Sequence, residues 1–135
     1  MTLSTQDALI YLMVVAATSD AQVSDRELDV IGSLVNRLPV FEGFNRDHLG
    51  QVAAEAIDLI KDSSSLDKVL GMILGAVPQR LHDTAYALAV EVASVDLRLE
   101  QEELRLLEMI RDGLELDGLT AAAIEASARA RLRRP

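Results

Sequence analysis

The strongest constraint on the fold of this chain is an internal repeat, in which residues 7–35 reappear imperfectly as residues 83–111. Each copy reads as a helix, a turn and a second helix. Acidic and apolar positions of the two copies fall in register, namely Asp20 with Asp96, Glu27 with Glu103, Val23 with Leu99, Leu28 with Leu104 and Ile31 with Leu107. Two copies of one supersecondary unit predict a pseudo-symmetric, all-helical bundle.

The composition also favours helices. Half of the 135 residues are hydrophobic but only 3% are aromatic, so the core has to be built from Ala, Leu, Val, Ile and Met. Alanine and leucine at this abundance favour helix over sheet. A chain of this length is expected to form one domain, residues 1–135, whose core needs neither metal nor disulfide.

Apolar periodicity and breaking residues divide the chain into about seven helices. The predicted helices are 4–18, 24–37, 45–62, 66–77, 79–94, 100–114 and 120–132. The first and the fifth correspond to each other in the repeat and are apolar on nearly every side, which is typical of enclosed helices. We expect these two to pack against each other across an approximate two-fold axis.

Local signals mark several helix ends. Residues 24–27 read as a capping box, in which the Ser24 and Glu27 side chains each accept a hydrogen bond from the other residue's backbone N–H. Residues 41–44 are predicted to form a connecting loop. Gly113 or Gly118 is expected to let the chain turn before the last helix.

The chain is acidic, with a formal charge of −9. Such a surface repels a phosphate backbone, so we expect no nucleic-acid partner. The acidity either keeps a small protein soluble or suits cations and basic partners. Four arginines stand among the last seven residues: Arg129, Arg131, Arg133 and Arg134. We expect them to form a solvated helix end, where the macrodipole favours cations; an acidic partner or a second copy of the chain is the alternative.

The absence of cysteine excludes disulfides, iron–sulfur clusters, cysteine-based zinc sites and thiol nucleophiles. It favours a cytoplasmic protein. The apolar run 8–17 is about half of the ~20 residues that a membrane span needs, so it is expected to form a buried helix.

The turn of each repeat carries two carboxylates seven residues apart. Asp20 and Glu27 in the first copy, and Asp96 and Glu103 in the second, could supply oxygen ligands to a divalent cation. The spacing is not that of an EF-hand, because position twelve of such a loop would be Ile31. The alternative is structural, since a carboxylate in a turn or at a helix start bonds backbone N–H groups.

Catalysis has little support in the sequence, and we expect no enzyme. The two histidines, His48 and His82, stand in unrelated segments and are expected to be surface residues near helix starts. No nucleophile, metalloprotease or phosphate-loop motif is present.

Glu91 interrupts an apolar run, and we expect it to face outward on a stripe with Asp83 and Ala87. Partial burial beside an arginine is the alternative.

The two turns resemble those of the tellurite-resistance TerB-like family, in which a helix ends in Ala-x-x-Asp-Gly and Ser or Thr and then Glu open the next helix. The matching segments are ATSDAQVSDRE at 17–27 and ASVDLRLEQEE at 93–103, although Ala21 and Leu97 stand where the family has glycine. The resemblance implies a duplicated helical bundle, a bacterial cytoplasmic protein linked to tellurite resistance or stress, and cation binding at Asp20, Glu27, Asp96 and Glu103.

The function favoured at this point is a non-enzymatic interaction or scaffold module with protein partners. The alternative is a small protein that binds or senses a divalent cation through its acidic turns. An exposed apolar face on the third or fourth helix would indicate a homodimer.

Overall fold

A computed structural model of the chain describes residues 3–17, 23–62, 65–95 and 101–135, except for the side chains of 101–103. Over these residues the chain forms seven α-helices and no strand, which confirms the all-α prediction. The helices are α1 (Thr5–Ala17), α2 (Asp25–Arg37), α3 (Leu49–Asp62), α4 (Leu66–Gly75), α5 (His82–Ala93), α6 (Gln101–Gly113) and α7 (Gly118–Arg131). Three single-turn 3-10 helices accompany them: η1 (Pro39–Phe41), η2 (Arg46–His48) and η3 (Gln79–Leu81).

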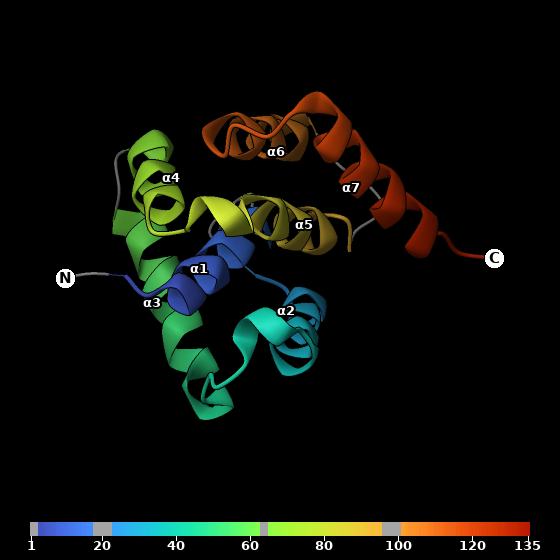
Figure 1. Ribbon diagram of the computed structural model, residues 1–135. Coiled ribbons are helices and arrows are strands. Elements are labelled where there is room, and N and C mark those ends of the chain that lie inside the picture. The colour runs from blue at the N-terminus through green and yellow to red at the C-terminus, as the bar shows by residue number, and fades with distance from the viewer. Residues whose placement is uncertain (1–2, 18–22, 63–64, 96–100) are drawn as a thin grey trace.

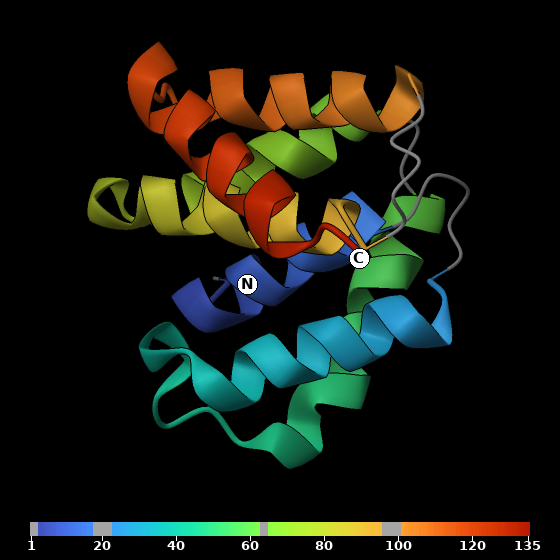
Figure 2. The same cartoon turned by 90° about the vertical axis from the view of Figure 1, so that its right-hand side faces the viewer.

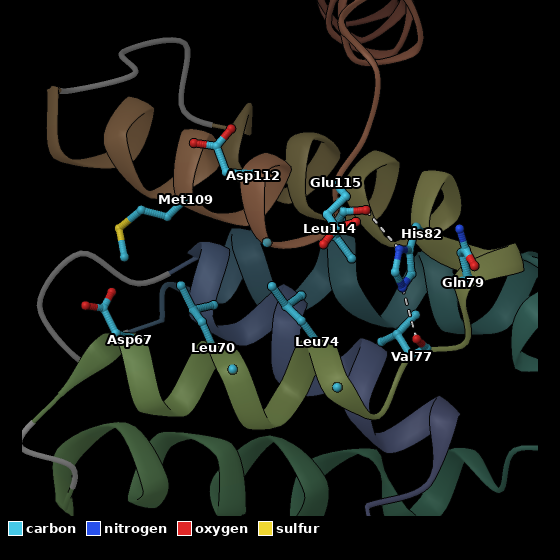
Figure 3. Close-up of a pocket in the computed structure, with 13 residues that line it drawn as sticks. Asp67, Leu70, Leu74, Val77, Gln79, His82, Met109, Asp112, Leu114 and Glu115 are labelled. Carbon is cyan, nitrogen blue, oxygen red and sulfur yellow. Dashed lines mark hydrogen bonds between the residues drawn. The ribbon is translucent and has the colours of Figure 1, made fainter.

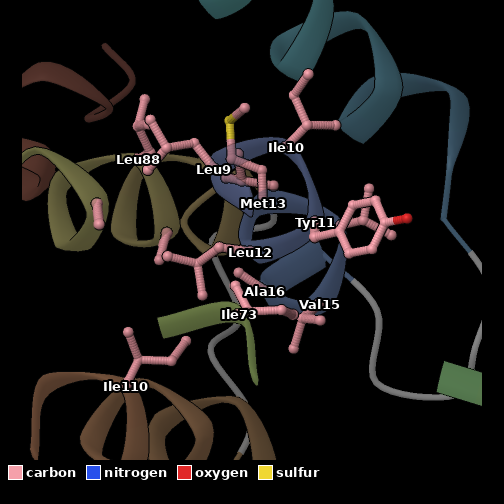
Figure 4. Packing of buried hydrophobic residues seen from close by; sticks show 14 of the residues in the cluster. Leu9, Ile10, Tyr11, Leu12, Met13, Val15, Ala16, Ile73, Leu88 and Ile110 are labelled. Carbon is pink, nitrogen blue, oxygen red and sulfur yellow. The ribbon is translucent and has the colours of Figure 1, made fainter. Parts of the chain in front are cut away.

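Helix α1 lies at the centre of the bundle and contacts five other helices (Figure 1). Every residue from Ala8 to Ala17 is buried. Its side chains point outward in several directions among residues of the surrounding helices, including Ile73 of α4, Leu88 of α5 and Ile110 of α6 (Figure 4). A helix that is apolar on every side is stable in water only when others enclose it. Within the described residues, no helix is both long and apolar enough to cross a bilayer.

Helix α5 is the second central element and packs along α1, as predicted. Helices α6 and α7 cover α5 on one side of this pair, and α2 and α3 cover α1 on the other (Figure 2). Helix α4 contacts α1, α3 and α6 and so joins the two sides. The two-fold relation between the repeats stays a prediction.

Side-chain caps fix the starts of several helices. The predicted capping box at α2 is confirmed, because the Glu27 N–H donates to Ser24 Oγ at 3.2 Å and the Ser24 N–H donates to Glu27 Oε1 at 3.0 Å. Helix α7 begins two residues before the predicted Thr120, because the Thr120 N–H donates to the Asp117 side chain at 2.8 Å. The bonds from Thr120, first that of its backbone N–H, lower the pKa of the Asp117 carboxyl.

The segment that was expected to be a loop at residues 41–44 begins inside a helical turn. Helix η1 ends at Phe41, and Gly43 then takes a φ of 83°, in the left-handed region that suits glycine. The rings of Phe41 and Phe44 pack edge to face with their centroids 6.4 Å apart. Phe41 is also part of the buried core and Phe44 packs against that core, which holds the segment against the bundle.

The turn between α6 and α7 does not use glycine as its left-handed residue, so the prediction of Gly113 or Gly118 is wrong. The left-handed residue is Glu115, with a φ of 55°. Gly113 instead ends α6 at a close contact with α4, since a Cβ at this position would lie 2.5 Å from Leu74 Cδ1. Gly118 is the first residue of α7.

Candidate functional site

The acidic turns that the sequence marked as a cation site are described only in part. Asp20 and Asp96 lie outside the described residues, as does the side chain of Glu103. Glu27 is described, and its carboxylate accepts the Ser24 N–H of the capping box. Within the described chain, no group of three or more side chains is placed to hold a metal ion. The cation site therefore stays a prediction, and Glu27 has the structural role that was its alternative.

An open groove of about 850 Å³ lies between α4 and α6 (Figure 3). Leu70 and Leu74 of α4 lie on its floor, where both are buried, and Met109 of α6 faces them from the other wall. Gly71 and Gly75 are exposed on the α4 side. The groove thus has an apolar floor and one wall with few side chains.

His82 closes one end of this groove. Its Nδ1 lies 2.9 Å from the carbonyl oxygen of Leu114 and its Nε2 lies 3.1 Å from that of Val77, so the ring bridges the chain after α6 and the chain after α4 (Figure 3). A neutral ring carries one N–H and donates to one carbonyl at a time, whereas a protonated ring donates to both. His82 lies at a helix start, as expected, because it is the first residue of α5, but its ring is half-buried and joins two helix ends.

The rim of the groove is negatively charged. Asp67 opens α4, Asp112 lies near the end of α6, and Glu115 follows in the turn. None of the described residues that line the groove is a lysine or an arginine. The C-terminal ends of α4 and α6 also meet at the end closed by His82, and a helix C-terminus carries partial negative charge. The groove is therefore suited to a cationic ligand.

A second and smaller cleft, of about 230 Å³, lies among α5, α6 and α7. At its base the buried Tyr86 donates a hydrogen bond from its hydroxyl to Glu125 Oε2 at 2.6 Å. Burial first, and then this hydrogen bond, raise the pKa of Tyr86 above its ordinary value. Arg111 and Arg129 line the cleft together with Glu108 and Glu125, so its charges balance.

Helix α7 is also held to α5 by an ion pair. Arg131 Nη1 donates to Glu91 Oε1 at 2.5 Å, and the Glu91 side chain is only 17% exposed. The favoured expectation, an outward stripe with Asp83 and Ala87, is therefore wrong for Glu91, and its alternative of partial burial beside an arginine is confirmed. The four C-terminal arginines are exposed, as expected of a solvated helix end, and Arg131 also pairs with its own chain.

The residues of the groove were not identified from the sequence. They come from α4 and α6, which lie far apart in the chain; α6 belongs to the second copy of the repeat and α4 to neither copy. The one available signal was the pair Gly71 and Gly75, because two glycines four residues apart weaken a helix and lie on one face of it.

Comparison with known proteins gives one family. The family model described as tellurite resistance protein TerB matches residues 6–126, nearly the whole chain. No curated protein and no solved structure matches the chain. The match includes both copies of the repeat, both acidic turns and both walls of the groove. The chain therefore belongs to the TerB family of tellurite resistance proteins.

Proposed function

We propose that this chain is a non-enzymatic interaction module of the tellurite-resistance response, which works in the cytoplasm by binding a protein partner. The observation that carries the proposal is the open groove between α4 and α6, with its buried apolar floor of Leu70 and Leu74 and its acidic rim. An apolar floor beneath a charged rim is the arrangement of many protein-binding surfaces.

The side chains best placed for catalysis in the groove have other roles. Both ring nitrogens of His82 face backbone carbonyls, which leaves neither nitrogen directed at a substrate. Asp67, Asp112 and Glu115 line the groove on its exposed rim, away from any buried base or nucleophile among the described residues. Neither arrangement resembles an activated nucleophile beside a general base, which supports binding rather than reaction.

The link to tellurite resistance is tested by deletion of the gene in its native host. We expect the deletion strain to tolerate less tellurite than its parent and expression of the intact chain to restore growth. A deletion strain with unchanged tolerance would contradict this part of the proposal. Assays of the purified chain for hydrolase and reductase activity test the non-enzymatic part, and any turnover that disappears with His82→Ala would overturn it.

A second candidate function is the binding of a divalent cation at the acidic turns. It is favoured by the register of Asp20 with Asp96 and of Glu27 with Glu103 in the two repeats. Calorimetric titration with calcium, magnesium, manganese and zinc tests it, together with thermal unfolding in the presence of each metal. Binding that is lost in Asp20→Asn and Asp96→Asn would support the site, and no heat and no stabilisation at millimolar metal would reject it.

A further inference from the structure

We propose that the groove between α4 and α6 binds a basic amphipathic helix of a partner protein, which places apolar residues over Leu70 and Met109 and its cations against the acidic rim. This inference rests on the proposed function, because it names the chemistry of the partner that the interaction module binds.

The fold does not require glycine at the two exposed glycine positions of α4, Gly71 and Gly75. A Cβ added at Gly71 or at Gly75 would meet no atom within 4 Å, and neither residue takes a positive φ. Glycine inside a helix is less stable than alanine because it loses more backbone freedom on folding. Neither packing nor backbone geometry therefore explains these glycines, whereas larger side chains at both positions would fill the groove.

The charge of the groove selects a basic occupant. Asp67, Asp112 and Glu115 surround it, and the described lining residues include no cation to balance them. Asp112 is paired outside the groove, since Arg111 Nε lies 3.6 Å from its Oδ1, and Arg111 itself lines the other cleft, among α5, α6 and α7. An acidic peptide would meet like charges here, and a basic one would meet opposite charges on both walls.

The shape of the groove favours a helix over an extended peptide. Its two walls are helices, whose backbone groups are already bonded within each helix, so an extended peptide would find no sheet edge on which to pair its own N–H and C=O groups. A bound helix pairs these groups internally. The wall from Leu66 to Gly75 is about 15 Å long at 1.5 Å per residue, which matches two to three turns of a bound helix with anchors at i, i+3 or i+4, and i+7.

The test uses a fluorescent synthetic helix with leucines at these anchor positions and lysines and arginines beside them, titrated with the full chain and followed by anisotropy. A matched peptide carries glutamates in place of the cations. We expect the basic peptide to bind at least about tenfold more tightly than the acidic one. We also expect its affinity to fall between about 20 and 150 mM salt, because part of the attraction is electrostatic.

Two variants of equal charge locate the binding. Gly71→Arg fills the groove and adds a cation, whereas Gly50→Arg adds the same cation on α3, at another glycine whose Cβ would meet no atom within 4 Å. We expect Gly71→Arg to weaken binding of the basic peptide at least about tenfold and Gly50→Arg to leave it within about twofold. Glu115→Gln, which removes one rim charge without adding bulk, is expected to weaken it about threefold at low salt.

Several outcomes would overturn the inference. Equal binding of the basic and acidic peptides would remove the charge argument, and equal weakening by Gly71→Arg and Gly50→Arg would place binding outside the groove. If the wild-type chain self-associates, and Gly71→Arg but not Gly50→Arg abolishes this, then the groove binds a second copy of the chain through its arginine-rich C-terminal end. A tellurite-sensitive deletion strain combined with no peptide binding would reject this inference and leave the proposed function standing.

Discussion

The substitution His82→Ala removes the ring that joins the C-terminal ends of α4 and α6. In the wild type its nitrogens lie 2.9 Å from the Leu114 carbonyl and 3.1 Å from the Val77 carbonyl. Alanine leaves a carbonyl of a buried residue without its hydrogen-bond partner, which costs about 1–3 kcal/mol. Alanine recovers roughly 0.5 kcal/mol as the better helix former at this position. We therefore expect the free energy of unfolding to fall by about 0.5–2.5 kcal/mol, which lowers the Tm of a chain of this size by roughly 2–9 °C.

The measurement is thermal and urea unfolding followed by circular dichroism. His48→Ala is the matched control, because His48 is the other histidine of the chain and lies exposed on η2. An exposed substitution of this kind is expected to change the free energy of unfolding by less than about 0.5 kcal/mol. If His82→Ala destabilises the protein no more than His48→Ala does, the ring does not hold the two helix ends together.

Three further predictions concern the other contacts. Tyr86→Phe loses the bond to Glu125 and should cost about 1 kcal/mol in urea unfolding. The pKa of Tyr86 is raised in the folded state, so the unfolded chain loses the hydroxyl proton at a lower pH than the folded chain does. Wild-type stability should therefore fall as the pH rises above ~10, and the stability of the variant, which lacks this hydroxyl, should fall less. A double-mutant cycle on Glu91 and Arg131 should give a coupling of less than about 1 kcal/mol that salt weakens, since Arg131 is 54% exposed. Glu115→Gly should raise the free energy of unfolding by roughly 0.5–1 kcal/mol, because glycine tolerates a φ of 55°; a loss of stability would show that the turn is not strained.

Most of the helices could be predicted from the sequence because the signals that define them are local. The capping box of Ser24 and Glu27 marks the start of α2 within a four-residue window, and the run from Ala8 to Ala17 is apolar on every face. The packing of α1 against α5 could be predicted because the apolar run of α1 recurs in α5. The start of α7 was placed too late because Asp117 and Gly118 read as a turn, although Asp117 caps the helix.

The candidate site was less predictable because it depends on contacts between distant segments. The groove exists because α4 and α6 lie side by side, and no local pattern gives the distance between Leu70 and Met109. His82 reads as a polar residue at a helix start unless the carbonyls of Val77 and Leu114 are known to face it. Glu91 likewise acquires its partner only when α7 folds back along α5.

The central claim is that the groove between α4 and α6 is the working surface of this TerB-family chain. Its most direct test is growth on tellurite of a deletion strain that expresses either Gly71→Arg or Gly50→Arg at equal level, with both proteins shown to be folded. Gly50→Arg is expected to restore tolerance as fully as the wild-type chain, and Gly71→Arg is expected to leave the strain sensitive. Full restoration by Gly71→Arg would contradict the account.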